Sequence, residues 1–340
     1  MANGPLNGLK ISPKVLLTGA GFTKDFGGFL ADEMWSFIFN SRSLDDFPKI
    51  KDLLRSDFSY ESVYHEILEG VYGKGEKEAI KQAVKSAYDR LDENIRNASG
   101  STKANSTSMS FFIEEFRGKP ETGKGFFFTL NQDIFIERYC RSNSNYSLII
   151  PGTTLQAFTQ NRPLSDLDYQ RLPDEKTVAK VFDIGHPHNP LRSSNFHYVK
   201  LHGSYHLRDS EGNAYMVIGK RKTEQISKEP LFRDYFSLFE GVLSSGDIEL
   251  FVIGYGFCDE HINKVIADSV ANHRLRLYIL SPISPDEFKR DLQSKPRCGC
   301  LWDTLQGYYP YSVSRVFPSD SNAKSSTIEY MQIIKDFFQR

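Results

Sequence analysis

The stretch Val15–Phe22, VLLTGAGF, runs from an apolar strand-like segment into a tight turn, and three later stretches repeat this design. They are FFFTLNQD at Phe126–Asp133, VKLHGS at Val199–Ser204 and FVIGYGF at Phe251–Phe257. Each places small or polar residues directly after an apolar run, as at the carboxyl end of a buried parallel strand. Loops at such strand ends bind ligands in open α/β sheets. The four stretches together predict an α/β protein with a ligand site at one edge of its sheet.

The rest of the chain alternates predicted strands and helices, which favours a doubly wound, Rossmann-like parallel sheet. Further strands are expected at Ile248–Ile253 and Leu275–Leu280, and helices at about Phe26–Asn40, Leu231–Leu243 and Asp259–Asn272. Residues 153–195 show weak periodicity and many Pro, Asp and Asn residues, which indicates an irregular surface segment.

A change of pattern after residue 40 predicts an inserted helical module. Glu76–Ala98 carries apolar residues at helical spacing among charged ones. We therefore expect residues 1–40 and 119–296 to form the ligand-binding domain and residues 41–118 to form the helical insert. Residues 297–340 are expected to be a C-terminal segment that ends in a helix.

The composition is that of an ordinary globular protein, with 39% hydrophobic and 25% charged residues. The 42 basic and 43 acidic side chains give a net charge of -1, so no overall field favours nucleic acid or an anionic membrane. The first residues lack the apolar core of a signal peptide, and no apolar run is long enough to span a bilayer. We expect a cytoplasmic protein that neither enters a membrane nor binds nucleic acid directly.

The four cysteines are too few and too scattered for a disulfide framework. Cys298 and Cys300 could join His186 or His188 in holding a metal ion. No CxxC pair exists, however, and the spacing matches no common zinc module. Reduced cysteines without a metal site are therefore the preferred interpretation.

The turn Gly19-Ala20-Gly21 follows a strand and precedes a predicted helix, so backbone N–H groups there could hold a pyrophosphate. A dehydrogenase would carry Gly-x-Gly-x-x-Gly and an acidic residue about 20 positions further on, at the end of a second strand. Here Phe22-Thr23-Lys24 follows the second glycine, and the next convincing strand lies beyond Gly118. A tight turn without a ligand is the alternative interpretation.

Two other strand ends carry groups that can do chemistry. TLNQD places Thr129, Asn131 and Asp133 at a strand-to-helix corner, where capping of the next helix would explain Asp133 but explains Asn131 less well. His202 ends a strand beside Gly203, which would leave open space on one side of the imidazole. A buried, hydrogen-bonded structural histidine is the alternative for His202.

The remaining strand ends offer contacts for a ligand. Glycines in Gly254-Tyr255-Gly256-Phe257 would let a ligand approach the backbone, and Asp259 and His261 open the following helix. We expect His261 on the surface of that helix or in its cap. Ser281 follows the last predicted strand of the sheet and could meet the adenosine half of a dinucleotide.

The motifs GAGF, TLNQD, LHGS and GYGF, in this order, resemble those of the sirtuin (silent information regulator) family. The likeness covers Lys14 to about Ser281, and it is greater to bacterial NAD-cleaving effectors of antiphage defence than to protein deacylases. The resemblance implies that the glycine turn binds the phosphates of NAD, that the TLNQD corner surrounds the nicotinamide ribose and that Phe22 walls the nicotinamide pocket. The predicted NAD-binding residues are Gly19, Ala20, Gly21, Phe22, Thr129, Gly254, Tyr255 and Ser281.

Three departures from the deacylase pattern matter. No cysteine lies between Gly203 and Gly254, so the two CxxC pairs of the deacylase zinc module are missing and no zinc is expected. Gly28-Phe29-Leu30-Ala31 replaces an acidic-aromatic-basic run, and Leu130 replaces the Gln of the deacylase TQN motif. None of these changes removes the Asn and His that the resemblance assigns to cleavage of the glycosidic bond.

The resemblance implies an NAD⁺ glycohydrolase that yields ADP-ribose and nicotinamide, with Asn131, His202 and Asp133 as catalytic residues. Nicotinamide leaves NAD⁺ as a neutral molecule, so the site needs only to stabilise an oxocarbenium-like ribose and position a nucleophile. His202 would accept a proton, Asn131 would orient water and ribose, and Asp133 would support the positive charge. A protein deacylase and a non-catalytic NAD sensor are the alternatives.

Destruction of NAD⁺ must be controlled, since it would kill the cell that makes the enzyme. The segment after Ser281 is short for a sensor domain, so we expect control by homo-oligomerisation or by a partner chain. The family analogy suggests a DNA-translocating ATPase of the HerA type or a phage protein as activator, in an abortive-infection response. NAD⁺ is expected as the substrate, with no other cofactor.

Overall fold

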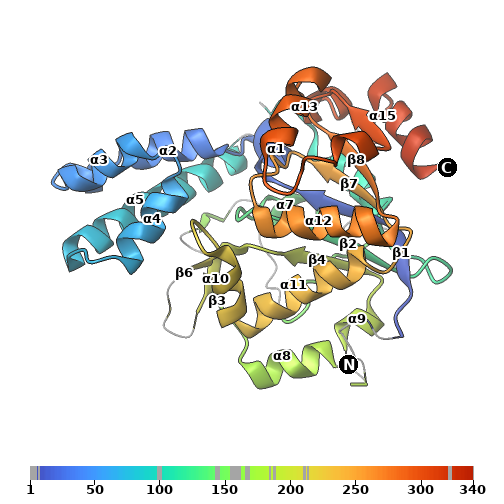
Figure 1. Ribbon diagram of the computed structural model, residues 1–340, viewed down its shortest axis with the longest axis horizontal. Helices are drawn as coiled ribbons and strands as arrows, with labels where there is room; N and C mark the ends of the chain where they lie inside the picture. Colours follow the sequence, from blue (N-terminus) through green and yellow to red (C-terminus); the bar gives the residue numbers. More distant parts are fainter. Residues whose placement is uncertain are drawn as a thin grey trace.

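The computed structural model describes residues 6, 8–97, 102–141, 146–153, 162–164, 169–183, 185–186, 189–209, 212, 214–320 and 324–339. Its centre is a parallel sheet with helices on both faces, and a lobe of helices extends to one side (Figure 1). None of the helices in these ranges is both long and apolar enough to cross a membrane.

Within the described ranges, six strands form the central sheet in the order β4-β2-β1-β7-β8-β9, and every pairing is parallel. Counted along the chain, this order is third, second, first, fourth, fifth and sixth, which is the doubly wound Rossmann arrangement. The predicted fold class is thus confirmed. A second sheet has the order β3-β5-β6. The strands are β1 (Ile11–Thr18), β2 (Lys124–Thr129), β3 (Gln170–Arg171), β4 (Phe196–Lys200), β5 (Gly203–Arg208), β6 (Ala214–Met216), β7 (Glu249–Ile253), β8 (Arg276–Leu280) and β9 (Gly307–Tyr309).

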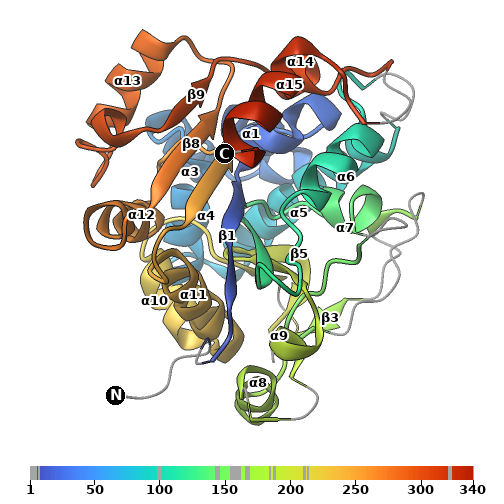
Figure 2. The same ribbon diagram turned by 90° about the vertical axis from the view of Figure 1, so that its right-hand side faces the viewer.

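Aromatic side chains fix the helices to the two faces of the sheet. Phe128 of β2 packs against Phe239 of α11, with ring centroids 5.0 Å apart. On the other face, Phe251 of β7 packs against Phe112 of α6 at 5.7 Å and against Phe337 at 5.0 Å. Figure 2 shows α11 and α12 on one side of β1, with α6, α14 and α15 on the other. Burial on both faces explains why these strands are continuous apolar runs.

The helices of the chain differ widely in length. They are α1 (Ala20–Thr23), α2 (Ala31–Phe39), α3 (Pro48–Ser56), α4 (Tyr60–Glu69), α5 (Lys74–Asn97), α6 (Ser106–Glu114), α7 (Phe135–Tyr139), α8 (Glu175–Phe182), α9 (Pro190–Ser193), α10 (Lys222–Lys228), α11 (Pro230–Leu243), α12 (Glu260–His273), α13 (Pro285–Ser294), α14 (Val313–Val316) and α15 (Ile328–Ile333). Single turns of 3₁₀ helix lie at Lys24–Phe26, Arg42–Leu44 and Trp302–Thr304, and a π-helical turn at Ile334–Phe338 follows α15.

The helical lobe contains α2, α3, α4 and α5 (Figure 1). The 24-residue α5 buries one apolar face, as its spacing predicts. The lobe therefore begins with α2, which starts before the predicted boundary at residue 41. Helix α6 lies within the predicted insert but packs on the sheet. Strand β9 belongs to the sheet although it lies beyond the predicted boundary at residue 296. The domain boundaries at 1–40, 41–118, 119–296 and 297–340 stay predictions.

Two local predictions were wrong. The helix expected at about Phe26–Asn40 begins only at Ala31, because Gly27 takes a left-handed φ of 95° and closes the preceding 3₁₀ turn. Glu33 then accepts a hydrogen bond from the backbone N–H of Leu30, at 2.8 Å, and caps the new start. The segment 153–195, expected to be irregular, contains α8 among its described residues, and Asp174 caps that helix.

Candidate functional site

Two glycine turns meet where the strand order reverses, between β1 and β7. Gly19 donates a backbone hydrogen bond to Ile253 at 3.0 Å, and Gly21 donates one to Gly254 at 2.9 Å. Gly254 has a φ of +64°, and an added Cβ would lie 2.2 Å from the backbone nitrogen of Phe22. Ligands of doubly wound sheets bind at this reversal point, so the turns lie at the edge that the fold favours for a site.

Replacing Gly254 by alanine is expected to push the two turns apart, because the new Cβ would clash with backbone atoms of Gly21 and Phe22. Those atoms can give way only if the whole turn shifts. We expect a loss of about 2 kcal/mol or more in the free energy of unfolding, measured in urea. Gly256→Ala is the matched control, since its Cβ would meet only Cys258 Sγ at 3.8 Å. Equal effects of the two variants would contradict this account.

The glycine turn itself leads into a helix of only one turn, α1, so the helix dipole there is weaker than the sequence suggested. Ala20 is exposed and Gly21 is partly exposed at this edge. Phe22 is fully buried and packs against Phe127 and Phe135, with ring centroids 6.4 Å and 6.2 Å away. Contact between Phe22 and a ligand stays a prediction.

The TLNQD corner forms one hydrogen-bonded group with α1. Thr23 Oγ1 donates to Asp133 Oδ2 at 3.0 Å, Asn131 Nδ2 lies 3.4 Å from Thr23 Oγ1, and the backbone N–H of Asn131 donates to Thr129 Oγ1 at 3.1 Å. Asp133 also accepts from the N–H of Phe135, the first residue of α7, at 2.9 Å. Burial raises the pKa of Asp133, and the nearby Lys200 ammonium opposes that rise.

The side-chain oxygen of Asn131 is the unusual atom of this corner. Asn131 is 8% exposed, and its Oδ1 is buried without a hydrogen-bond donor among the described residues. An unmet buried acceptor costs about 1–3 kcal/mol. A ligand hydroxyl or a bound water would supply the missing donor.

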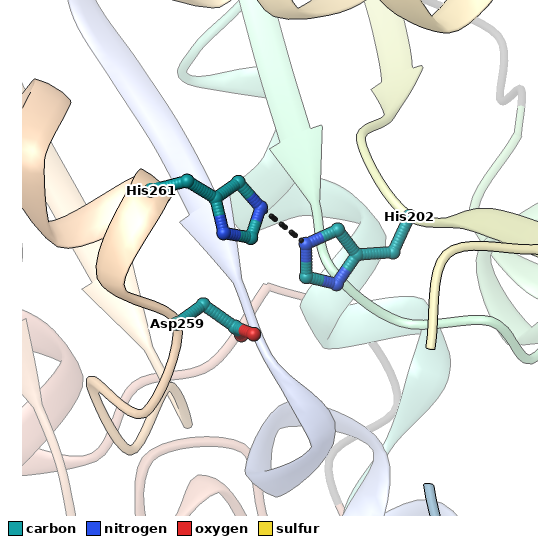
Figure 3. A group of neighbouring side chains, drawn as sticks. All are labelled: His202, Asp259 and His261. Carbon is teal, nitrogen blue, oxygen red and sulfur yellow. Dashed lines mark hydrogen bonds between the residues drawn. The ribbon is translucent and has the colours of Figure 1, made fainter. Parts of the chain in front are cut away.

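His202 lies between β4 and β5 and is only 3% exposed. Its Nε2 is 3.0 Å from Nε2 of His261, in the first turn of α12, and Asp259 lies beside the pair (Figure 3). Burial lowers the pKa of His202 to about 3 and that of His261 to about 4, so both rings are neutral at pH 7. His261 occupies the space expected beside His202, and it lies in the first turn of α12 with its ring partly exposed, in keeping with the expected place on the helix surface.

A chain of ion pairs joins this histidine pair to the helical lobe. Lys222 Nζ contacts Asp259 Oδ1 at 2.8 Å and Glu61 Oε2, in α4, at 2.9 Å. Burial alone would raise the pKa of Asp259, but attraction to His202 and Lys222 holds it at about 2. The carboxylate therefore stays ionised beside the two imidazoles.

A cavity of about 750 Å³ opens next to these residues. Elements α4, α10, α11 and α12 surround it, and its lining includes Glu61, Lys222, Asp259 and His261. His202 is not part of the lining. His261 therefore stands between the buried His202 and the open space.

Ligand atoms of His202, Asp259 and His261 lie within 4.8 Å of one another, a spacing that could hold a metal ion. The Lys222 ammonium already occupies the Asp259 carboxylate and would repel a dication. Among the described residues, Cys298, Cys300 and His186 form no such group, and His188 lies outside those residues.

The remaining predicted residues support the site. Tyr255 accepts a hydrogen bond from the backbone N–H of Asp259 at 3.1 Å, which fixes the start of α12. Ser281 is buried after β8, and its N–H donates to Tyr309 of β9 at 3.1 Å. Contact of Gly254, Tyr255 and Ser281 with NAD stays a prediction.

Gln132 connects the two polar groups of the site, which share no direct hydrogen bond among the described residues. Its backbone oxygen accepts from Ser204 Oγ at 2.9 Å, and its Nε2 lies 3.3 Å from the oxygen of Val217. Val217 in turn donates to the backbone oxygen of His202 at 3.0 Å. Asn131 and His202 are thus held within one framework.

The contacts that join His202, His261, Lys222 and Glu61 were not predicted from the sequence. One signal was present in the sequence. Asp259 and His261 closely follow the strand-end motif GYGF, which places two polar side chains at the start of the same helix. Lys222 and Glu61 gave no local signal, because their roles arise from packing of α10 and α4.

A doubly wound sheet with glycine turns and buried polar groups at its carboxyl edge defines a Rossmann-like α/β protein. The chain belongs to the SIR2-like domain family, whose model matches residues 125–299, just over half of the 340 residues. This match confirms the resemblance to sirtuin-like proteins and associates the chain with NAD-related enzyme activity. A comparison with curated proteins found no match.

Proposed function

We propose that the protein is an NAD⁺ glycohydrolase that converts NAD⁺ and water to ADP-ribose and nicotinamide. The observation that carries the proposal is the Oδ1 of Asn131, which is buried beside the glycine turns and has no hydrogen-bond donor within the part of the chain that the structure describes. A ribose hydroxyl or the attacking water would donate to this oxygen. The SIR2-like family supports NAD as the molecule that brings that group.

In this proposal His202 is the base, because its neutral imidazole can accept a proton at pH 7. Asn131 orients the water and the ribose. Asp133 lies on the same corner, and its charge would stabilise the positive ribose in the transition state. Thr129 and Thr23 position these side chains through the hydrogen bonds that they make.

The biological setting that we propose is antiphage defence by abortive infection, with NAD⁺ loss as the lethal step. The activator would be self-assembly of the chain, a HerA-type ATPase or a phage protein. Only the resemblance to bacterial effectors supports this setting. Glu61 of the helical lobe, which reaches Asp259 through Lys222, offers a route by which assembly could affect the site.

Chromatographic measurement of nicotinamide and ADP-ribose tests the activity. We expect the purified chain to release both in equal amounts from NAD⁺ without a peptide. Release that requires an acetyl-lysine peptide would indicate a deacylase, and calorimetric NAD⁺ binding without release would indicate a sensor. Activation by self-assembly predicts a rate that rises more steeply than protein concentration.

A further inference from the structure

Hydrolysis of NAD⁺ produces a proton, and the structure must provide a way out for it. This inference rests on the proposed function. The bond between C1′ and the pyridinium nitrogen breaks, and its electron pair neutralises nicotinamide. A bond from C1′ to the water oxygen forms, and one water proton is lost in each turnover. His202, at 3% exposure, has little access to bulk water of its own.

His261 lies where such a proton would have to pass. Its Nε2 is 3.0 Å from Nε2 of His202, a normal hydrogen-bond distance, and the ring is partly exposed. It also lines the cavity of about 750 Å³, which His202 does not reach. Figure 3 shows the two rings directed at each other through these nitrogens.

We propose that His261 is a positioning residue for His202 and relays the reaction proton from it to the cavity. As His202 takes a proton from water on Nδ1, its Nε2 proton moves to Nε2 of His261, and His261 releases its Nδ1 proton to the cavity. Both rings end neutral but in the opposite tautomers, and each ring must flip about its Cβ–Cγ bond before the next turnover, because a reverse transfer would carry the proton back. The resting pair must therefore hold its shared proton on His202.

The Asp259 carboxylate offsets part of the cost that burial places on a transient imidazolium. The Asp259 carboxylate, at the start of α12, attracts it, and Lys222 of α10 opposes it. Glu61 of α4 partly neutralises Lys222 through their contact at 2.9 Å. From α11 the uncharged ring of Phe236 packs on His261, with centroids 5.7 Å apart.

Steady-state kinetics of three variants test the relay. His261→Ala is expected to lower kcat for nicotinamide release about 100-fold while KM for NAD⁺ changes less than about twofold. His261→Gln can hydrogen-bond to His202 but cannot relay a proton, so its kcat should stay low. His273→Ala, an exposed histidine in the last turn of the same helix, is the matched control and should match wild type.

Rescue by free imidazole is a readout that a purely structural role would not move, whereas the pH profile reports how far His202 is covered. Imidazole in solution should restore kcat of His261→Ala, because the vacated position faces the cavity. Without the His261 ring, His202 is less buried and its pKa should rise toward 6.5. As the pH is lowered, His261→Ala should therefore lose activity at a higher pH than wild type does. Full activity of His261→Gln, or a change in KM alone, would overturn the relay.

Nuclear magnetic resonance of ¹⁵N-labelled histidine tests the pair without relying on catalysis. Nε2 of His202 should carry a proton and Nε2 of His261 should not, and His261→Ala should shift the His202 signals while His273→Ala leaves them unchanged. Two unprotonated Nε2 atoms would overturn the relay even if wild type were inactive. Stoichiometric shifts of both rings on adding Zn²⁺, with loss of activity, would instead assign a metal site.

Discussion

Alanine in place of His202 or Asn131 is expected to abolish nicotinamide release, with a loss of at least about 100-fold in kcat for each. His202→Ala removes the proposed base for the reaction proton. Asn131→Ala removes the buried Oδ1, which has no donor among the described residues and would orient water and ribose. His273→Ala and Asn272→Ala, both exposed on α12, are the matched controls.

Both replaced side chains are buried, so folding must be measured beside activity. His202→Gln and Asn131→Asp keep most of the volume, and urea unfolding of each variant reports whether the loss is structural. If the two residues act as one unit, the double variant should lose little more than the worse single variant. Undiminished release by folded variants at both positions would show that the catalytic site lies elsewhere.

The strand ends could be predicted because their signal is local. An apolar run followed by Gly19 or by Asn131 shows where a buried strand stops, and parallel strands stop at the same edge. The family motifs then associated that edge with NAD, and the family model supports this association. The start of α2 was harder, because the left-handed Gly27 and the side-chain cap from Glu33 override the continuous helical pattern.

The histidine pair could not be predicted in the same way. His202 and His261 are 59 residues apart and come from a strand junction and a helix start. Their contact depends on how α12 packs over the turn between β4 and β5. Glu61 and Lys222 depend further on where the helical lobe lies. Such contacts follow from three-dimensional packing and leave no periodicity in the sequence.

Glu137 in α7 forms a buried ion pair with Lys200 at the end of β4, and its removal is expected to have a large effect on stability. Lys200 Nζ lies 2.8 Å from Glu137 Oε1, and both side chains are almost fully buried, with Glu137 1% exposed and Lys200 3% exposed. Burial raises the pKa of Glu137, and the Lys200 ammonium opposes that rise. Lys200 also donates to the backbone oxygen of Asp133, so the pair joins the TLNQD corner to the strand that leads to His202.

Replacing Glu137 by alanine is expected to lower the free energy of unfolding by about 3–5 kcal/mol, because a buried ammonium loses its counter-ion. The double variant Glu137→Leu with Lys200→Met should recover most of that stability in urea, since neither member of the ion pair is left buried without its partner. Glu93→Ala, which removes an exposed partner of Arg90 from α5, is the control and should cost at most about 1 kcal/mol.

The double variant also separates stability from catalysis. Without Lys200 the backbone of Asp133 loses a hydrogen bond that fixes the corner, so nicotinamide release should stay below wild type although the fold is restored. Removal of a positioning contact, with the reacting groups intact, is expected to cost about tenfold in kcat. Full activity in the stable double variant would show that the ion pair serves folding alone, and that Asn131 and Asp133 are placed by Thr23 and Thr129 without it.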